Sequence, residues 1–410
     1  MGNIGIITEY NPFHNGHNYQ LQQIRSQFPD KKIICIMSGN YVQRGEPAIY
    51  NKYLRTECAL SSGVDIIFEL PTIFATASAE YFATAAVLAL AKTGIIETLC
   101  FGAEDDNLQH FYTIAKLLIE EPYSYKNALK KNLKEGHSYP KARSLSIDEY
   151  FGNNIYHDFL KSPNNILGVE YIKAILRYNV PIKPYIIKRT AAEYHDISIQ
   201  QKICSATALR VSLKNNPSIY DYEENIPKQC VELIAQSPFG KPVFPKHFYP
   251  YIQHALWEHR NHYTDFADVN DEISNQLSNL LHYPLSIDEL VQSLSNRNYT
   301  TSRIRHILQN IMLGVHSSEL QSIKDLGYIR YLRLLGFQKN ASDVLKQMKT
   351  SCEVPMINKV AHAKKILSDN DYSIFERELS FNMLYNQVYY NIYDILPDSE
   401  YKHTVITHHF

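Results

Sequence analysis

Two histidines three residues apart, His14 and His17, stand in the segment Thr-Glu-Tyr-Asn-Pro-Phe-His-Asn-Gly-His at residues 8–17. The segment follows an apolar run at residues 4–7 and precedes apolar side chains with helical spacing. A chain that leaves a strand and enters a helix presents free backbone N–H groups, which suit phosphate. Gly16 lets the backbone come close, and both imidazoles can donate hydrogen bonds to phosphoryl oxygens as charge develops. The pattern predicts a phosphate-binding turn, with a capped helix start and two incidental histidines as the alternative.

Short apolar runs that alternate with helical patterns must position this turn. The runs lie at residues 4–7, 32–37, 64–68 and 98–101, and such near-continuous apolar strands are typical of a sheet buried on both faces. The alternation predicts an α/β, Rossmann-like domain with a parallel sheet over residues 1–216. Within it we expect a helical insertion at about 105–160, then a helix at 166–176 and a fifth strand at 184–187.

The texture of the sequence changes between residues 217 and 250, where six prolines interrupt every regular pattern. We place the domain boundary there. No clear strand follows Tyr251, whereas leucines and isoleucines keep helical spacing. Residues 217–410 are therefore expected to form a mostly α-helical second domain.

Composition restricts the class of protein. The 410 residues are 45% hydrophobic and 20% charged, which excludes a disordered or collagen-like chain. Forty-one Lys and Arg against forty-two Asp and Glu give a net charge of -1, so any field that attracts nucleic acid must be local. The six cysteines form no C-x-x-C pair. We expect reduced thiols, no signal peptide, no membrane span and a cytoplasmic location.

The segment Pro-Phe-His-Asn-Gly-His resembles the (H/T)-x-G-H motif of the nucleotidyltransferase superfamily, which is related to class I aminoacyl-tRNA synthetases. The resemblance implies attack on the α-phosphate of ATP with pyrophosphate as leaving group, and it makes His14 and His17 the catalytic pair. The only Gly-Lys dipeptide, at residues 240–241, precedes a proline and lacks the upstream glycine, so a P-loop is excluded.

A second segment, residues 204–210, resembles the Ile-Ser-Ser-Thr-x-Ile-Arg signature of the same enzymes. The hydroxyls of Ser205 and Thr207 at a helix start, with Arg210 one turn later, can hold the β- and γ-phosphates. The segment departs from the common form, because Cys204 and Ala206 replace the leading isoleucine and the second serine. An ordinary serine cap with a surface arginine is the alternative.

Over its whole length the chain resembles the bacterial tRNA(Met) cytidine acetate ligase family. The stretches that carry this resemblance are residues 6–17, 37–48, 101–104, 163–171, 188–189 and 194–196. Such enzymes are understood to activate acetate with ATP as acetyl-adenylate and to pass the acetyl group to N4 of the wobble cytidine of elongator tRNA(Met). The resemblance implies ATP, acetate and this tRNA as partners; it implies no protein partner, and no membrane is expected. Mg2+ is expected from the ATP chemistry rather than from a motif, because the sequence shows no dedicated set of metal ligands.

The resemblance also implies which residues bind ATP. Gly102 at a strand end, Asn165 at a helix start and Arg189 after the fifth strand would complete the nucleotide pocket. A turn glycine, a helix cap and a solvated side chain are the alternatives. The other implied ATP-binding residues lie in or beside the first turn: Ile7, Thr8, Glu9, Tyr10, Asn11, Pro12, Phe13, His14, Asn15, Gly16, His17 and Gln20.

Basic side chains are distributed unevenly along the chain. Residues 291–365 hold twelve Lys and Arg against four Asp and Glu, and residues 126–143 hold six against one. A local basic field is the footprint of a phosphate backbone, although a solvated helix face is the alternative for each patch. The residues expected to contact tRNA are Lys130, Lys131, Lys134, Arg330 and Arg333.

The polar loop at residues 38–48 follows the second strand and is a candidate substrate gate. Arg44 in this loop can attract an acetate carboxylate, while a salt bridge with Glu46 is an equally good interpretation. Two other functions account for part of these residues. A small-molecule adenylyltransferase for a nucleotide cofactor would use His14 and His17 but leave the C-terminal half, with its basic patch at residues 291–365, without a role. A non-catalytic RNA-binding protein with a relic nucleotide fold would have no use for His14, His17 and Arg210.

Overall fold

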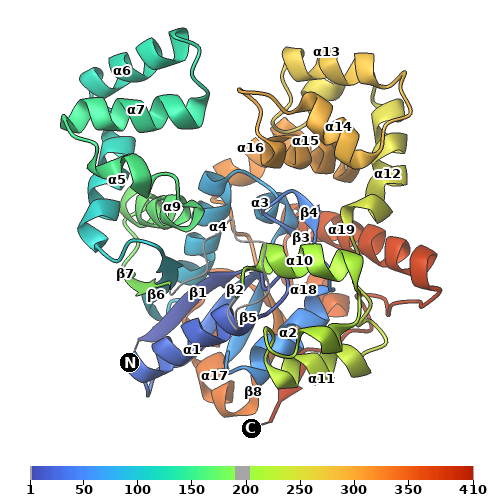
Figure 1. Ribbon diagram of the computed structural model, residues 1–410. Coiled ribbons are helices and arrows are strands. Elements are labelled where there is room, and N and C mark those ends of the chain that lie inside the picture. The colour runs from blue at the N-terminus through green and yellow to red at the C-terminus, as the bar shows by residue number, and fades with distance from the viewer. Residues whose placement is uncertain (1, 190–203, 410) are drawn as a thin grey trace.

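The computed structural model describes residues 2–189 and 204–409. A central sheet runs through the molecule (Figure 1), with the strand order β10-β8-β5-β2-β1-β6-β7 and β9 paired to β8. Each neighbouring pair from β5 to β7 is parallel, which confirms the predicted α/β class. These strands are β1 (Asn3–Thr8), β2 (Ile33–Ser38), β5 (Ile66–Leu70), β6 (Ile96–Ala103) and β7 (Lys183–Lys188).

Side chains of the strands alternate between two hydrophobic cores. In β2, Ile34 and Ile36 face one core and Cys35 and Met37 face the other, which explains why the strand is apolar at nearly every position. The first core is covered by α3 (Thr72–Ala75), α4 (Ala79–Lys92), α5 (Leu108–Glu120) and α9 (Pro163–Arg177). The second is covered by α1 (Asn15–Gln27), α2 (Lys52–Ser61), α10 (Ala206–Asn215) and α11 (Lys228–Gln236).

The chain between β6 and α9 is helical. After α5 come α6 (Tyr123–Lys134), α7 (Tyr139–Phe151) and α8 (Ile155–Phe159). The pair α6 and α7 pack against each other and project from the body of the molecule (Figure 1). Pro163 begins α9, the helix expected at 166–176, and β7 is the expected fifth strand.

The second half of the chain is mostly helical, as predicted. Four helices share a hydrophobic core of their own: α12 (Pro245–Glu258), α13 (Asp271–Leu280), α14 (Ile287–Leu294) and α15 (Thr301–Leu313). After these four come α16 (Ser317–Asp325), α17 (Ser342–Ser351), α18 (Ala363–Ile366) and the long α19 (Asp369–Tyr393). Within the described part of the chain, no helix is long and apolar enough to span a membrane.

The expectation that no strand follows Tyr251 is wrong. Three strands lie there, β8 (Leu332–Gln338), β9 (Met356–Ile357) and β10 (Ile406–His408), and β8 pairs antiparallel with β5. The charged Arg333 inside β8 hides the strand in the sequence, yet it is buried between the carboxylates of Glu69 and Glu400. The second half therefore completes the sheet of the first, and the boundary at residues 216–217 stays a prediction.

Candidate active site

The turn between β1 and α1 brings His14 and His17 together. His14 is the N-cap of α1, where its Nδ1 accepts a hydrogen bond from the Gly16 N–H at 3.0 Å. His17 Nδ1 accepts from the His14 N–H at 3.3 Å, and the two ring centres are 3.8 Å apart. Because both Nδ1 atoms act as acceptors, each neutral ring carries its proton on Nε2. The turn holds two N–H donors of the kind that stabilise charge on phosphoryl oxygens.

Burial keeps both imidazoles neutral. It lowers the pKa of His14 to about 3, and the guanidinium groups of Arg189 and Arg210 act in the same direction. It also lowers the pKa of His17, with His14 and Arg189 adding to the effect. A neutral imidazole donates a hydrogen bond without adding net charge, so the positive field at the turn comes from the two arginines.

The second motif lies against the first. Arg210 Nη1 donates to the Asn11 carbonyl oxygen at 2.8 Å, and Arg210 Nη2 donates to Thr207 Oγ1 at 3.2 Å. Ser205 is the N-cap of α10, and its hydroxyl accepts from the Ala208 N–H at 3.1 Å. Two segments almost two hundred residues apart thus form one site, and Arg210 is held at the edge of the turn.

Asn11 carries a buried polar group that the protein leaves unused. Its Oδ1 accepts from the Ile49 N–H at 2.8 Å, whereas its Nδ2 has no hydrogen-bond partner among the residues that the structure describes. A buried donor without a partner costs about 1–3 kcal/mol, and an acceptor on a ligand would offset that cost. This amide is therefore a second reason to expect a ligand with hydrogen-bond acceptors, such as a phosphate, at the turn.

Most other residues of the predicted ATP-binding segment build the turn itself. Tyr10 and Phe13 are buried and pack ring to ring, with centroids 4.7 Å apart. Thr8 Oγ1 lies 3.1 Å from Cys35 Sγ on β2, and Asn15 Nδ2 donates to the Glu224 carbonyl oxygen at 2.7 Å. Contacts of ATP with Ile7, Pro12 and Gln20 stay predictions.

Arg55 on α2 is a positioning residue that sequence reasoning missed. It is 1% exposed, and its guanidinium donates to four backbone carbonyl oxygens, those of Glu9, Ser38, Gly39 and Tyr50. It therefore ties the turn after β1 to the loop after β2. The only signal in the sequence is its position on α2, and Lys52 three residues earlier makes that helical face look solvated.

Gly102, Asn165 and Arg189 meet on the β6 and β7 side of the turn. Arg189 follows β7, its N–H donates to the Ala103 carbonyl oxygen at 2.9 Å, and its Cγ would lie 3.5 Å from a Cβ added at Gly102. Asn165 is 2% exposed, and its Oδ1 accepts from the Glu104 and Asp105 N–H groups at 3.0 and 3.1 Å. Its Nδ2 donates to the Phe159 carbonyl oxygen at 3.1 Å. Asn165 thus holds the chain after β6, a role that the sequence did not indicate.

Tyr194, His195 and Asp196, which carried part of the family resemblance, lie outside the described residues.

The loop after β2 forms a small hairpin, β3 (Tyr41–Val42) and β4 (Glu46–Pro47), that contacts both the turn and α15. Glu9 Oε1 accepts from the Gln43 N–H at 2.7 Å, and His306 Nε2 on α15 donates to the Gln43 carbonyl oxygen. Gly45 has φ +73°, and a Cβ there would lie 2.6 Å from the His306 backbone nitrogen. Glu46 forms an ion pair with Arg305 of α15.

A hollow of about 270 Å³ lies beside the turn, between α10, α12, α14, α15 and the β3–β4 hairpin, and basic side chains line it. Arg44, Arg210 and Arg305 line it together with Lys214 and Lys246. The acidic side chains among its lining residues are Glu46 and Asp288. The hollow therefore has an excess of positive charge, and Arg44 belongs to it.

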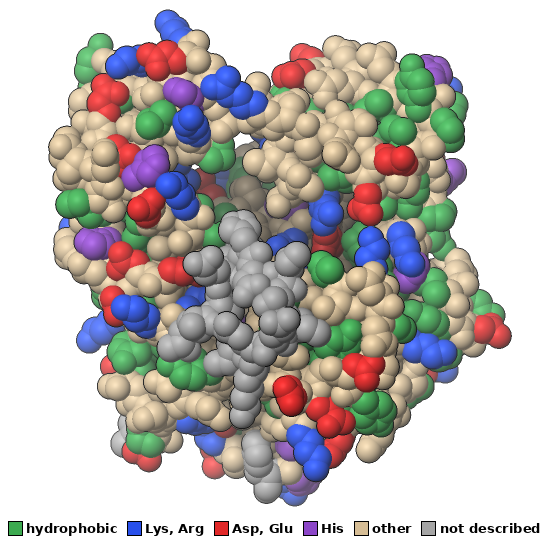
Figure 2. All heavy atoms as spheres, viewed as in Figure 1, with side chains coloured by type: hydrophobic (Ala, Val, Ile, Leu, Met, Phe, Trp, Pro, Cys, Tyr) green, Lys and Arg blue, Asp and Glu red, His purple; other side chains and the backbone are tan. Residues whose placement is uncertain are grey.

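The residues predicted to contact tRNA divide into two groups. Lys130, Lys131 and Lys134, here called the α6 lysines, are exposed on α6, and Figure 2 shows Lys and Arg side chains over the α6–α7 pair. The expectation for Arg333 is contradicted, because its side chain is 5% exposed and paired with Glu69 and Glu400. Arg330 is partly exposed but donates to both carboxylate oxygens of Asp371.

A protein-bound metal ion has no evident ligand set in the described ranges, where no group of three or more His, Cys, Asp or Glu side chains is arranged to hold one.

Known proteins resemble this chain over nearly its whole length. The model of the HIGH nucleotidyl transferase family matches residues 1–403. A Clostridium acetobutylicum protein named tRNA(Met) cytidine acetate ligase is 37% identical over 367 residues, covering 88% of this chain and 90% of that protein. An Acetivibrio thermocellus protein of the same name is 36% identical and covers 95% of each chain. Crystal structures of Thermotoga maritima TmcAL, apo and bound with alpha-thio ATP, cover all of both chains with TM-scores of 0.93 and 0.91 at 28% and 26% identity.

Proposed function

This chain belongs to the HIGH nucleotidyl transferases, in the family of the tRNA(Met) cytidine acetate ligases, and we propose that it is an ATP-dependent ligase that acetylates elongator tRNA(Met). Acetate is first activated as acetyl-adenylate, and the acetyl group then passes to N4 of the wobble cytidine to give N4-acetylcytidine. The observation that carries the proposal is the pair of neutral imidazoles at the β1–α1 turn, each with Nε2–H available to a phosphoryl oxygen.

In the first step an acetate oxygen attacks the α-phosphorus of ATP, and the bond to the bridging oxygen of the β-phosphate breaks to release pyrophosphate. Negative charge grows on the α-phosphoryl oxygens and on the leaving group. His14 and His17 would donate to these oxygens from Nε2, and Arg210 would hold the leaving pyrophosphate. In the low dielectric of the buried turn such donors stabilise the transition state strongly.

In the second step the cytidine N4 amine attacks the acetyl carbonyl carbon, the bond to AMP breaks, and the amine loses a proton. AMP is the leaving group, and the positive charges of Arg189 and Arg210 would stabilise its phosphate as the bond to the acetyl group breaks. Mg2+ would be carried by the phosphate oxygens of ATP, because the described residues offer no cluster of carboxylates for it. The nucleotide base would lie on the Gly102 and Arg189 side of the turn, and the α6 lysines would contact the tRNA backbone. A protein that uses ATP and tRNA in this way is expected in the cytoplasm.

The direct test is to incubate the purified protein with ATP, Mg2+ and labelled acetate, with and without tRNA. We expect acetyl-AMP in both reactions, label on the RNA only with tRNA present, and no product when ATP is omitted. Acetyl-AMP without label on any tRNA would leave a small-molecule adenylyltransferase. RNA binding without acetyl-AMP would leave a non-catalytic RNA-binding protein.

A further inference from the structure

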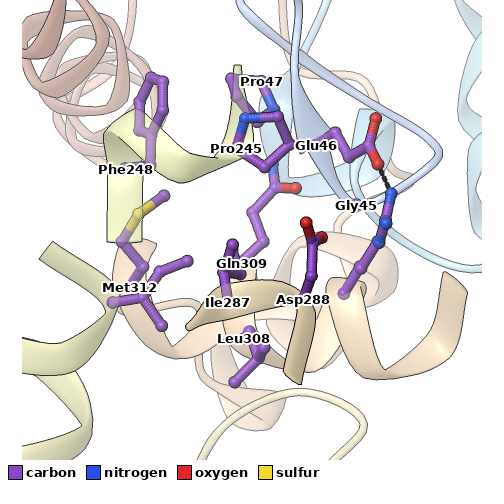
Figure 3. A pocket seen from close by; sticks show the side chains of 12 residues that line it. Gly45, Glu46, Pro47, Pro245, Phe248, Ile287, Asp288, Leu308, Gln309 and Met312 are labelled. Atoms are coloured by element: carbon purple, nitrogen blue, oxygen red, sulfur yellow. Dashed lines mark ion pairs between the residues drawn. The ribbon is translucent and has the colours of Figure 1, made fainter. Parts of the chain in front are cut away.

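A small recess of about 30 Å³ adjoins the hollow between α10 and α15, and Gln309 is one of the residues that line it (Figure 3). The two spaces adjoin, because they share the lining residues Glu46, Pro47, Pro245, Ile287, Asp288 and Arg305. The hollow is basic, whereas the recess adds the apolar side chains of Phe248 and Met312. A basic hollow thus adjoins a recess whose lining is mostly apolar, with the charged side chains of Glu46, Asp288 and Arg305 on the wall that the two spaces share.

Gln309 is a buried amide without a use in the fold. It is 3% exposed, and neither Oε1 nor Nε2 has a hydrogen-bond partner among the described residues. Its neighbour Asn310 is buried as well but donates from Nδ2 to the Ala267 carbonyl oxygen at 3.2 Å. In Figure 3 the Gln309 side chain extends from α15 toward Pro47 and Pro245, into the recess. A buried amide in this state destabilises the protein unless a ligand supplies both a donor and an acceptor.

The chemistry of the two spaces selects the ligand. An amide offers one donor and one acceptor in a plane, which is the pattern that a nucleobase edge complements. Phe248 and the two prolines provide apolar contact for a flat ring, and the basic side chains of the hollow suit phosphate. The hollow has room for a single nucleotide, and the recess admits only the edge of its base.

The nucleoside part of ATP is not the expected occupant, because its predicted contacts at Gly102 and Arg189 lie by β6 and β7. The sheet order places those strands on the opposite side of β1 from β2, whose following loop lines the hollow. Thr207 and Arg210, the predicted partners of the β- and γ-phosphates of ATP, line the edge of the hollow as well, so a nucleotide bound farther inside would lie beside the turn that holds His14 and His17.

We propose that the hollow and its recess bind one unpaired nucleotide of the RNA substrate, with its base edge on Gln309 and its phosphates near Lys214 and Lys246. The inference rests on the proposed function, because it assigns a contact surface to the RNA that receives the acetyl group. Gln309 would be a specificity-determining residue that recognises a base, whereas the α6 lysines would contact only the RNA backbone.

The test compares the binding of two labelled RNAs to the full chain by fluorescence anisotropy: a stem–loop with an anticodon-arm sequence and a fully paired duplex with the same stem. Gln309→Leu removes both amide atoms and leaves an apolar side chain in a mostly apolar recess. We expect its Kd for the stem–loop to rise about tenfold while its Kd for the duplex stays unchanged. Its melting temperature is expected to equal or exceed that of the wild type, because the unpartnered amide is gone.

Gln321→Leu is the matched control, since Gln321 is an exposed glutamine on α16 that bonds to Asp325. It is expected to bind both RNAs as the wild type does. If Gln309→Leu proves unstable, Lys246→Glu on the exposed rim gives a second test and should raise the stem–loop Kd and lower its salt dependence. Wild-type affinity for the stem–loop in a folded Gln309→Leu protein would overturn the proposal. Failure of the wild type to form acetyl-AMP would instead reject the proposed function, and the binding comparison would still decide whether the hollow takes an unpaired nucleotide.

Discussion

Replacement of His17 by alanine tests the role of the β1–α1 turn most directly. The change removes one Nε2–H donor from the site and one acceptor, Nδ1, from the His14 N–H. It leaves Leu21 and Ile24, which anchor α1 in the core, in place. Two consequences follow, one for the fold and one for the reaction, and their magnitudes differ.

The structural loss is small. Removal of a side-chain partner from a helix cap costs about 1 kcal/mol, against a total stability of about 5–15 kcal/mol for a folded protein. The catalytic loss is larger, because a donor that faces developing charge contributes about 2.7–4 kcal/mol to the transition state, a factor of about 10²–10³ in turnover. We therefore expect a folded His17→Ala protein that binds tRNA normally and forms acetyl-AMP about 10²–10³ times more slowly.

The chain offers a matched control for the cap. His247 stands at the same position of α12, where its Nδ1 accepts the Phe244 N–H at 3.1 Å. His247→Ala should lower the melting temperature about as much as His17→Ala does, but leave acetyl-AMP formation near the wild-type rate. The assay is acetyl-AMP formed from ATP and labelled acetate by each purified variant, with circular dichroism as the check of folding. An unchanged rate in His17→Ala would refute the assignment of His17 as a catalytic donor.

Three further outcomes are expected. Asn165→Ala should weaken ATP binding more than tRNA binding, and it should lower the melting temperature because two N–H groups after β6 lose their acceptor. Titration calorimetry with ATP measures the change in ATP affinity. A loss of tRNA binding with normal ATP binding would contradict this prediction. Replacement of the α6 lysines by glutamate should raise the tRNA Kd. It should also reduce the slope of log Kd against log salt by about 0.7–0.9 for each phosphate that the protein no longer neutralises. An unchanged slope would show that the α6 lysines form an ordinary solvated helix face. Acid should destabilise the fold through His14, whose pKa of about 3 in the folded protein lies below the pKa of a histidine in the unfolded chain, about 6.5. Between pH 6.5 and 3 only the unfolded chain binds this proton. The free energy of unfolding therefore falls by about 1.4 kcal/mol for each pH unit that the pH drops. Urea unfolding at pH 7 and pH 5 measures this loss, and a smaller loss is expected in His14→Gln; equal losses in both proteins would assign the effect to other groups.

Features that depend on neighbouring residues could be predicted from the sequence. The turn at His14 is one, because a helix cap is fixed by residues within three positions of it, and the parallel strands are another, because burial on both faces makes them continuously apolar. The joining of residues 204–210 to this turn depended on the family resemblance rather than on a local pattern.

Features that depend on distant charges could not be predicted. Arg333 looked like part of a basic surface, and only the carboxylates of Glu69 and Glu400, far away in the sequence, make it an interior residue of a strand. Gln309 gave no signal either, because a glutamine in a helical pattern is usually solvated and its missing partners appear only when α15 packs against Pro47 and Pro245.

The contacts of the β3–β4 hairpin explain how two sites on different parts of the chain keep a fixed spacing. Arg55 binds the carbonyl oxygens of Glu9 and Gly39, so the turn and the hairpin share one buried cation. Gln43 then bonds to Glu9 through its N–H and to His306 through its carbonyl oxygen, so a single residue of the hairpin bridges the turn and α15. The ATP site and the proposed base site are thus joined by buried and partly buried hydrogen bonds rather than by a flexible linker. Acetyl transfer requires this, because an amine must meet the carbonyl carbon within about 3–3.5 Å, and a displacement of about 1 Å can cost about 10²-fold in rate.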